Sequence, residues 1–244
     1  MRLSAFLWPV SATLLALFVW QGIVSTTGVA SFILPGPGRV ATAWWENLGL
    51  IAEHTLVTLS EVVLGLLIGG LLGAATALSL ASSRTAQELI RPMLVFSQAL
   101  PVFALAPILT LWLGYGLWSK VAMAVLIIYF PVTSAFFDGL MRTPRGWLDL
   151  AQTMGASPRA ILWRIRVPNA MPSLGTGLKL AAVYAPIGAV IGEWVGASRG
   201  LGYLMLLANG RAKTDLMFAA MLTLGVMSVI LYMLADRAAQ RLAR

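Results

Sequence analysis

Residues 56–81 read LVTLSEVVLGLLIGGLLGAATALSLA, and this stretch decides the class of fold. It carries one charge, Glu61, and its other side chains are apolar, small or hydroxyl-bearing. An α-helix needs about 20 mostly apolar residues to cross the hydrocarbon of a bilayer, and this stretch is long enough. Because a soluble surface needs charged side chains that are almost absent here, we expect residues 56–81 to cross a membrane.

The composition of the whole chain supports this interpretation. Of the 244 residues, 59% are apolar and 11% are charged, whereas soluble domains carry about 25% charged residues. The same proportions exclude intrinsic disorder, which requires low hydrophobicity and high charge. The chain has no cysteine, which excludes disulfides, a thiolate metal site and a cysteine nucleophile. One histidine and scattered carboxylates form no metal-ligand pattern, so we expect no metal, no cofactor and no catalytic residues.

Six apolar segments are long enough to span a bilayer. They are residues 6–24, 56–81, 93–113, 117–137, 174–194 and 216–235. Gly114-Tyr115-Gly116 separates the third segment from the fourth and predicts a tight turn between them. The sequence therefore predicts an all-α, polytopic membrane protein in which residues 1–244 form one transmembrane domain of six helices.

The cationic residues predict the orientation of these helices. With the N-terminus in the cytoplasm, 12 of the 17 lysines and arginines fall on the cytoplasmic side and 5 on the outside. Cytoplasmic loops are enriched in Lys and Arg, so we expect both termini in the cytoplasm. Topology then accounts for most of the net charge of +8, and no nucleic-acid partner is expected. Met1-Arg2 before an apolar run would also suit a secretory signal, but the length of the run favours a retained helix.

The longest cytoplasmic loop has the pattern of two short helices. Thr143-Pro144 and Ser157-Pro158 each place a proline at the first helical position, after a hydroxyl capping residue. Gly155 is expected to end the first helix and Pro168 the second, because the residue before a proline avoids helical geometry. This pattern alone leaves two interpretations open. The loop is either an amphipathic hairpin on the lipid headgroups or a docking element for a groove in a cytoplasmic partner.

The same loop resembles the motif of a known family. The run 149–155, DLAQTMG, is followed after nine residues by 165–168, IRVP. This arrangement is similar to the E-A-A-x-x-x-G-x9-I-x-L-P motif of the membrane subunits of binding-protein-dependent ABC importers. Asp149 stands for Glu, Leu150 for Ala and Val167 for Leu, and the spacing is intact. The resemblance implies that residues 143–168 form a coupling helix that docks on an ATPase subunit, with five coupling residues: Asp149, Ala151, Gly155, Ile165 and Pro168.

Other stretches resemble one subfamily of these permeases. Residues 34–37 (LPGP), His54 with Thr58, and residues 200–203 (GLGY) are similar to importers of sulfonates, taurine, nitrate and related solutes. Permeases for thiamine-precursor pyrimidines or riboflavin share this layout. The resemblance implies a type I importer permease that forms a homodimer in the bacterial inner membrane, with cytoplasmic ABC ATPase subunits and a periplasmic solute-binding protein. The chain lacks the G-x-x-x-x-G-K-[ST] loop, which agrees with ATP hydrolysis in another subunit.

Polar residues within the spans are candidate contacts for the solute. Glu193, near the outer end of the fifth span, is either a solute contact or a carboxylate satisfied at the interface, and the two interpretations stay equal. Gln98 near Pro101 and Tyr184 near Pro186 are further candidates. A proline frees a backbone carbonyl, which a wet cavity can satisfy.

Three other features of the spans predict structural roles rather than transport. Glu61 is expected to form internal hydrogen bonds. Gly65, Gly69 and Gly73 lie four residues apart, which places them on one face of a helix and predicts close approach of a neighbouring helix. Lys179, at the inner start of the fifth span, is expected to reach the lipid headgroups.

We therefore expect the membrane-spanning subunit of an ATP-driven importer that moves a small organic solute inward by alternating access. Acidic residues near the cavity favour a thiamine-precursor pyrimidine or a related heterocycle over an alkanesulfonate or taurine, by Coulomb attraction. The alternative is a secondary transporter driven by an ion gradient, with Glu193 or Glu61 as the ion site. A membrane enzyme is disfavoured, because the sequence contains no recognisable set of acid, base, nucleophile and metal ligands.

Overall fold

The computed structural model describes residues 2–242, with side chains from residue 11 onward, and the described chain is almost entirely helical. The elements are α1 (Arg2–Thr27), α2 (Pro37–Glu46), α3 (Leu48–Ser82), α4 (Arg84–Ala99), α5 (Val102–Leu113), α6 (Leu117–Met141), α7 (Arg145–Thr153), α8 (Pro158–Ile161), the π-helical turn η1 (Leu162–Arg166), α9 (Val167–Gly196), α10 (Leu201–Gly210) and α11 (Thr214–Leu242). No strand occurs in the described residues.

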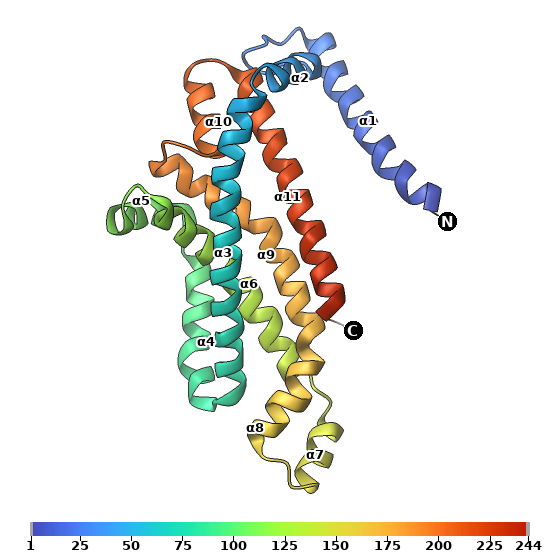
Figure 1. Ribbon diagram of the computed structural model, residues 1–244, viewed down its shortest axis with the longest axis vertical. Coiled ribbons are helices and arrows are strands. Elements are labelled where there is room, and N and C mark those ends of the chain that lie inside the picture. The colour runs from blue at the N-terminus through green and yellow to red at the C-terminus, as the bar shows by residue number, and fades with distance from the viewer. Residues whose placement is uncertain (1, 243–244) are drawn as a thin grey trace.

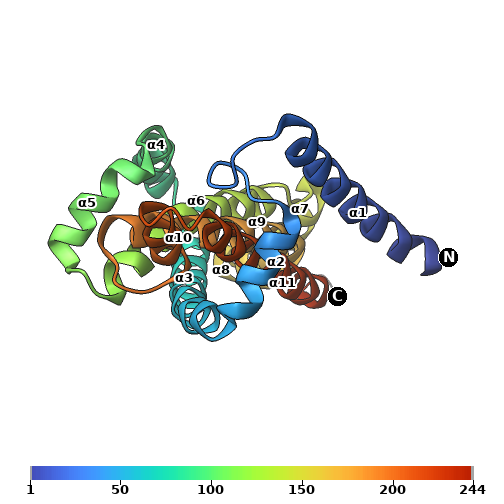
Figure 2. The ribbon, with the colours of Figure 1, turned by 90° about the horizontal axis from the view of Figure 1, so that it is seen from above.

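Four helical segments of the described chain are long and apolar enough to cross a membrane. They are α3, α6, α11 and the 39-residue segment Pro158–Gly196, which joins α8, η1 and α9. These segments form one bundle, with α7 and α8 at one end and α2 and α10 at the other (Figure 1). Helices α1 and α5 project from opposite sides of this bundle (Figures 1 and 2). The first predicted span, 6–24, falls within α1, whose described apolar part is Ser11–Thr27.

The single helix predicted over residues 93–113 is wrong. The segment contains the end of α4 and all of α5, and the two helices are bent by 102° at their junction. The break falls at Leu100-Pro101, where Leu100 has an extended backbone (φ −80°, ψ 127°). A residue before a proline is pushed into this region by the proline ring, which explains why α4 ends there. This bent pair makes a fifth candidate span.

The prediction that Pro168 ends the second short helix is also wrong. The helix begins as predicted, because the Ser157 hydroxyl accepts a hydrogen bond from the Ala160 N–H at 3.2 Å. It then passes through η1 and continues as α9 to Gly196. A proline inside an α-helix normally clashes with the carbonyl four residues earlier. The wider π-helical turn before Pro168 relieves that clash, so the helix continues.

The glycine face of α3 packs on α6, as predicted from the spacing. A Cβ atom on Gly65 would lie 2.6 Å from the Ala124 Cβ, and one on Gly73 would lie 3.0 Å from the Val132 Cβ. The backbones of α3 and α6 therefore approach more closely than side chains would allow. Near the middle of the continuous helix Pro158–Gly196, the Lys179 Nζ lies 3.2 Å from the Asp236 Oδ1 of α11. Lys179 thus forms an ion pair with α11, whereas the sequence predicted contact with the lipid headgroups.

Candidate functional site

The helical hairpin 143–168 forms the end of the bundle that Figure 1 shows at the bottom. Helix α7 stops at Thr153, and Gly155 has a φ of +79°, which a residue with a side chain adopts only under strain. The Gly155 and Ala156 N–H groups donate to the carbonyls of Gln152 and Ala151, both at 2.9 Å. These bonds satisfy the end of α7 and turn the chain back into α8. The predicted role of Gly155 in ending the first helix is therefore confirmed.

The outer face of α7 carries large apolar side chains that the described chain does not cover. Trp147, Leu150 and Met154 are 55%, 61% and 79% exposed, and their spacing places them on one face of the helix. Beside them lies a groove of about 510 Å³, which is lined by residues of α7, η1 and the start of α9. An apolar surface of this kind, bordered by a charged residue such as Arg164, is typical of a contact site for another molecule.

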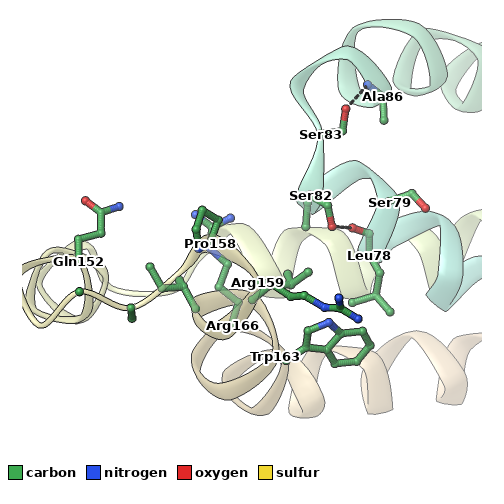
Figure 3. A pocket seen from close by; sticks show the side chains of 15 residues that line it. Leu78, Ser79, Ser82, Ser83, Ala86, Gln152, Pro158, Arg159, Trp163 and Arg166 are labelled. Atoms are coloured by element: carbon green, nitrogen blue, oxygen red, sulfur yellow. Dashed lines mark hydrogen bonds between the residues drawn. The ribbon is translucent and has the colours of Figure 1, made fainter.

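A larger cavity of about 1040 Å³ separates the hairpin from the turn between α3 and α4. Figure 3 shows Arg159, Trp163 and Arg166 lining it from the hairpin side. Serine hydroxyls from the α3–α4 turn line the other side, and they are bonded to their own backbone: Ser82 Oγ donates to the Leu78 carbonyl at 2.6 Å. The hairpin is therefore attached to the bundle through α6 and α9, with space between it and the α3–α4 turn.

The predicted coupling residues have different exposures within the hairpin. Asp149, Gly155 and Pro168 are exposed, and Ile165 is half-buried. Ala151 is buried, as is Ile161 of α8. Ala151 therefore packs inside the hairpin, whereas Asp149 lies on its surface, where the described residues supply no ion-pair partner.

The structure does not bring the three candidate solute contacts together. Gln98 is exposed at the end of α4, where its amide donates to the Ser97 hydroxyl at 3.3 Å. Tyr184 is exposed in the middle of α9, and Glu193 is buried near the end of the same helix. None of the three lines either cavity described above.

Glu193 instead belongs to a buried polar cluster at the end of the bundle opposite the hairpin. Its Oε1 accepts a hydrogen bond from the Thr58 hydroxyl at 2.6 Å. Its Oε2 accepts from the backbone N–H of Gly202, and from that of Tyr203 at 3.3 Å. Both N–H groups lie in the first turn of α10, where they have no partner within the helix. The carboxylate therefore caps α10 from the last turns of α9.

Two side chains of α3 hold the loop that joins α9 to α10. The His54 Nδ1 accepts a hydrogen bond from the Gly200 N–H at 2.9 Å, and the Thr58 Oγ1 accepts from the Leu201 N–H at 2.8 Å. The His54 ring also stacks on Tyr203, with the ring centroids 5.9 Å apart. Residues 54, 58 and 200–203, which carried part of the family resemblance, thus form one contact between α3, α9 and α10.

Lys120 completes the cluster from α6. Its Nζ donates to the carbonyl oxygens of Tyr115, Gly116 and Gly196, the last at 2.7 Å. Sequence reasoning placed Lys120 in an outside segment and did not connect it with the two glutamates. The sequence contained one signal that could have grouped these residues, which is their depth in the membrane. The predicted topology puts Glu61, Lys120 and Glu193 in the outer parts of three different spans.

Comparison with known proteins identifies the family. Residues 62–244 match the family model described as "Binding-protein-dependent transport system inner membrane component". The chain belongs to this family of ABC importer permeases. The match begins at Val62, so it includes the hairpin, Lys120 and Glu193 but not the cluster residues His54, Thr58 and Glu61.

Relatives that match over most of their length support the same identification. The permease is 50% identical to a probable ABC transporter permease protein of Haemophilus influenzae, over 90% of each chain. It is 38% identical to the formylaminopyrimidine transport permease ThiX of Halalkalibacterium halodurans, over 80% of this chain and 78% of ThiX. It is 37% identical to the riboflavin transport system permease RibX of Chloroflexus aurantiacus, over 99% of this chain and 92% of RibX.

A solved structure confirms the type I importer fold of the permease. A chain of the methionine ABC transporter MetNI, in an inward-facing conformation, superposes with a TM-score of 0.71 at 18% identity. The superposition covers 82% of this chain and 99% of that one. Membership of an ATP-driven family also removes the basis for the alternative of an ion-gradient-driven transporter that uses Glu193 or Glu61.

Proposed function

We propose that the permease works as a homodimer that moves a small organic solute from a periplasmic binding protein to the cytoplasm. Two separate ATPase subunits supply the energy, and the permease itself catalyses no reaction. The observation that carries this proposal is the uncovered apolar face of α7, with Trp147, Leu150 and Met154, on a hairpin that ends the bundle. Asp149, Ala151, Gly155, Ile165 and Pro168 form the coupling element for the ATPase.

The position of the hairpin favours docking to a protein over lying on lipid headgroups. In Figure 1, α7 and α8 extend along the long axis beyond the α3–α4 turn. A helix adsorbed on a bilayer lies in the interface plane, at the level where the spans end. A hairpin that protrudes past that level presents its apolar residues to the cytoplasm, where a protein groove would cover them.

The continuous helix Pro158–Gly196 is suited to carry movement from the hairpin to the other end of the bundle. A helix of 39 residues spans about 58 Å at about 1.5 Å per residue. Glu193 sits near its far end and contacts α10 there. A displacement of the hairpin by the ATPase would therefore reach the outer ends of α3 and α10, which is the coupling that alternating access requires.

For the substrate, we propose a thiamine-precursor pyrimidine or a related heterocycle. Relatives whose names specify a formylaminopyrimidine or riboflavin are 38% and 37% identical, whereas the taurine permease TauC of Escherichia coli is 27% identical. Coulomb attraction by Glu61 and Glu193 adds no support, because both side chains are buried within the protein.

Reconstitution tests this proposal. The permease is purified with its ATPase and binding protein in proteoliposomes, and uptake of radiolabelled formylaminopyrimidine, riboflavin and taurine is measured with and without ATP. We expect ATP-dependent uptake of a heterocycle that requires the binding protein. Uptake of taurine alone would contradict the substrate, and uptake driven by an ion gradient without ATP would contradict the mechanism.

A further inference from the structure

The buried polar cluster contains three ionisable side chains whose charges do not balance. Glu61, Lys120 and Glu193 are 3%, 2% and 1% exposed. With all three ionised, the cluster would hold one excess negative charge within the membrane-spanning part of the bundle. A net charge buried there is costly, because neither lipid nor the apolar core solvates it. Neutrality of the cluster therefore requires one additional positive charge.

The hydrogen bonds show which carboxyl group is the anion. Both oxygens of Glu193 accept bonds, from the Thr58 hydroxyl on one side and from the N–H groups of Gly202 and Tyr203 on the other. A carboxylate is an acceptor at both oxygens, whereas a protonated carboxyl is a donor at one of them. The first turn of α10 adds the positive end of a helix dipole. The groups around Glu193 are thus donors that suit an ionised carboxylate.

Glu61 is placed differently. Glu61 follows Thr58 by about one turn of α3 and so lies on the same face, where the Thr58 hydroxyl donates a hydrogen bond to Glu193. The two carboxyl groups are close enough to interact, and the Glu61 Oε2 is buried with no hydrogen-bond partner among the described residues. Two carboxylates are both acceptors, so they form a hydrogen bond only when one carries a proton. Lys120 does not supply the missing donor, because its Nζ donates to three backbone carbonyls.

The other titratable groups near the cluster are already engaged. His54 uses its Nδ1 as an acceptor for the Gly200 N–H, so that nitrogen carries no proton. Glu53 and Arg199 form an exposed pair with 3.9 Å between Oε1 and the guanidinium nitrogen, where solvent screens both charges. The cluster therefore has no internal source for the additional positive charge.

We propose that Glu61 is a proton-binding site. Glu61 keeps one proton and uses it to donate a hydrogen bond to the Glu193 carboxylate. This makes the cluster neutral and joins α3 to α9 and α10 at the outer end of the bundle. Loss of this proton would leave two carboxylates in contact between α3 and α9, and their repulsion would favour separation of these helices. The proposal concerns the stability of the outer end and does not depend on the identity of the solute.

Isosteric variants test the assignment of Glu61 as the protonated group and of Glu193 as the ionised group. The permease is purified with its ATPase subunits in nanodiscs, as the wild type and as Glu61→Gln and Glu193→Gln. A glutamine amide resembles a neutral carboxylic acid, so E61Q keeps both a donor for Glu193 and the neutrality of the cluster. We expect its Tm within about 3 °C of the wild type, and that of E193Q lower by at least about 6 °C. Glu53→Gln, an exposed change on the same helix, is the control.

Infrared spectroscopy provides a readout that does not depend on the stability of a variant. A protonated carboxyl has a carbonyl stretch separate from that of carboxylates, and it shifts in D₂O. We expect this band in the wild type and in E53Q, and its loss in E61Q. A wild type without the band, or an E61Q variant destabilised as much as E193Q, would overturn the proposal. A wild type without the band but stabilised by Na⁺ would overturn it in favour of a sodium ion.

Discussion

Gly200 and Gly202 show how individual residues determine the structure of the end of the permease opposite the hairpin. Gly200 has a φ of +109°, and a Cβ atom there would lie 2.2 Å from the Glu193 Cδ. A Cβ atom on Gly202 would lie 2.8 Å from the Glu193 Oε2. Side chains at either position would displace the carboxylate from the first turn of α10. The glycines of the 200–203 stretch are therefore required by the approach of Glu193 to the backbone.

Gly155 has the corresponding role at the hairpin end of the bundle. Replacing it by valine forces a β-branched residue to φ +79°, at a cost of about 1–3 kcal/mol, and displaces α7 from α8. We expect ATP hydrolysis to continue while solute uptake falls at least about fivefold, since a misplaced coupling helix transmits less movement. Transport and ATPase activity in proteoliposomes check this expectation.

Gly146→Ala is the matched control for Gly155→Val. Gly146 lies within α7, and a Cβ atom there would meet no atom within 4 Å. An alanine at this position should leave membrane insertion, uptake and ATPase activity unchanged. Unchanged uptake in the Gly155→Val variant as well would count against a coupling role for this turn.

At the scale of elements, α7 is short and is held at its start. It spans Arg145–Thr153, and the Thr143 hydroxyl at its start donates to the Leu140 carbonyl of α6 at 3.1 Å. The Asn169 amide at the start of α9 contacts the same hydroxyl at 3.5 Å. The start of the hairpin thus contacts both spans that it connects, so we expect a force on its exposed face to reach both α6 and α9.

The exposed face of α7 predicts the effect of a charge on ATPase binding. Met154→Asp places a carboxylate on the apolar face that would enter the groove of the ATPase, where burying an unpaired charge is costly. We expect at least about a tenfold loss of ATPase affinity, measured by co-purification and by biolayer interferometry. Thr153→Asp, an exposed neighbour outside the apolar groove, should retain binding. Equal binding by both variants would refute docking through this face.

At the scale of the whole molecule, the two functional regions occupy opposite ends of the bundle. The hairpin lies at one end, and the contact of α3, α9 and α10 lies at the other. The helix Pro158–Gly196 extends between them. The proposed orientation places the hairpin in the cytoplasm and the polar cluster toward the periplasm.

Reporter fusions check this orientation. A green fluorescent protein fused after Arg244 should fluoresce, whereas alkaline phosphatase at the same point should be inactive, because both report a cytoplasmic C-terminus. A phosphatase inserted in the loop between α1 and α2, at Ser31, should be active. The opposite pattern would place the hairpin outside the cell and contradict its contact with an ATPase.

The membrane-spanning class, the turn at Gly155 that ends α7 and the Ser157 cap of α8 followed from the sequence, because each depends on local properties. Hydropathy over about 20 residues determines whether a segment enters lipid, and hydroxyl, proline and glycine residues act on their own turn. The predicted start of α7 was wrong: Thr143 makes no cap hydrogen bond, and the helix begins at Arg145, after Pro144. The spacing of Gly65, Gly69 and Gly73 likewise predicted close packing without naming α6 as the partner. Local signals were weaker at prolines: Pro101 separates two helices, whereas Pro168 follows a π-helical turn and lies within one.

The role of Glu193 was decided only by the tertiary structure. From the sequence, its carboxyl group was equally a solute contact or a group at the interface. In the fold it accepts hydrogen bonds from Thr58 of α3 and from the start of α10, beside Glu61. These partners are as many as 135 residues apart along the chain, and no local pattern specifies which faces of separate helices meet. The sequence determined that these charges lie inside the membrane, and helix packing determined that they contact one another.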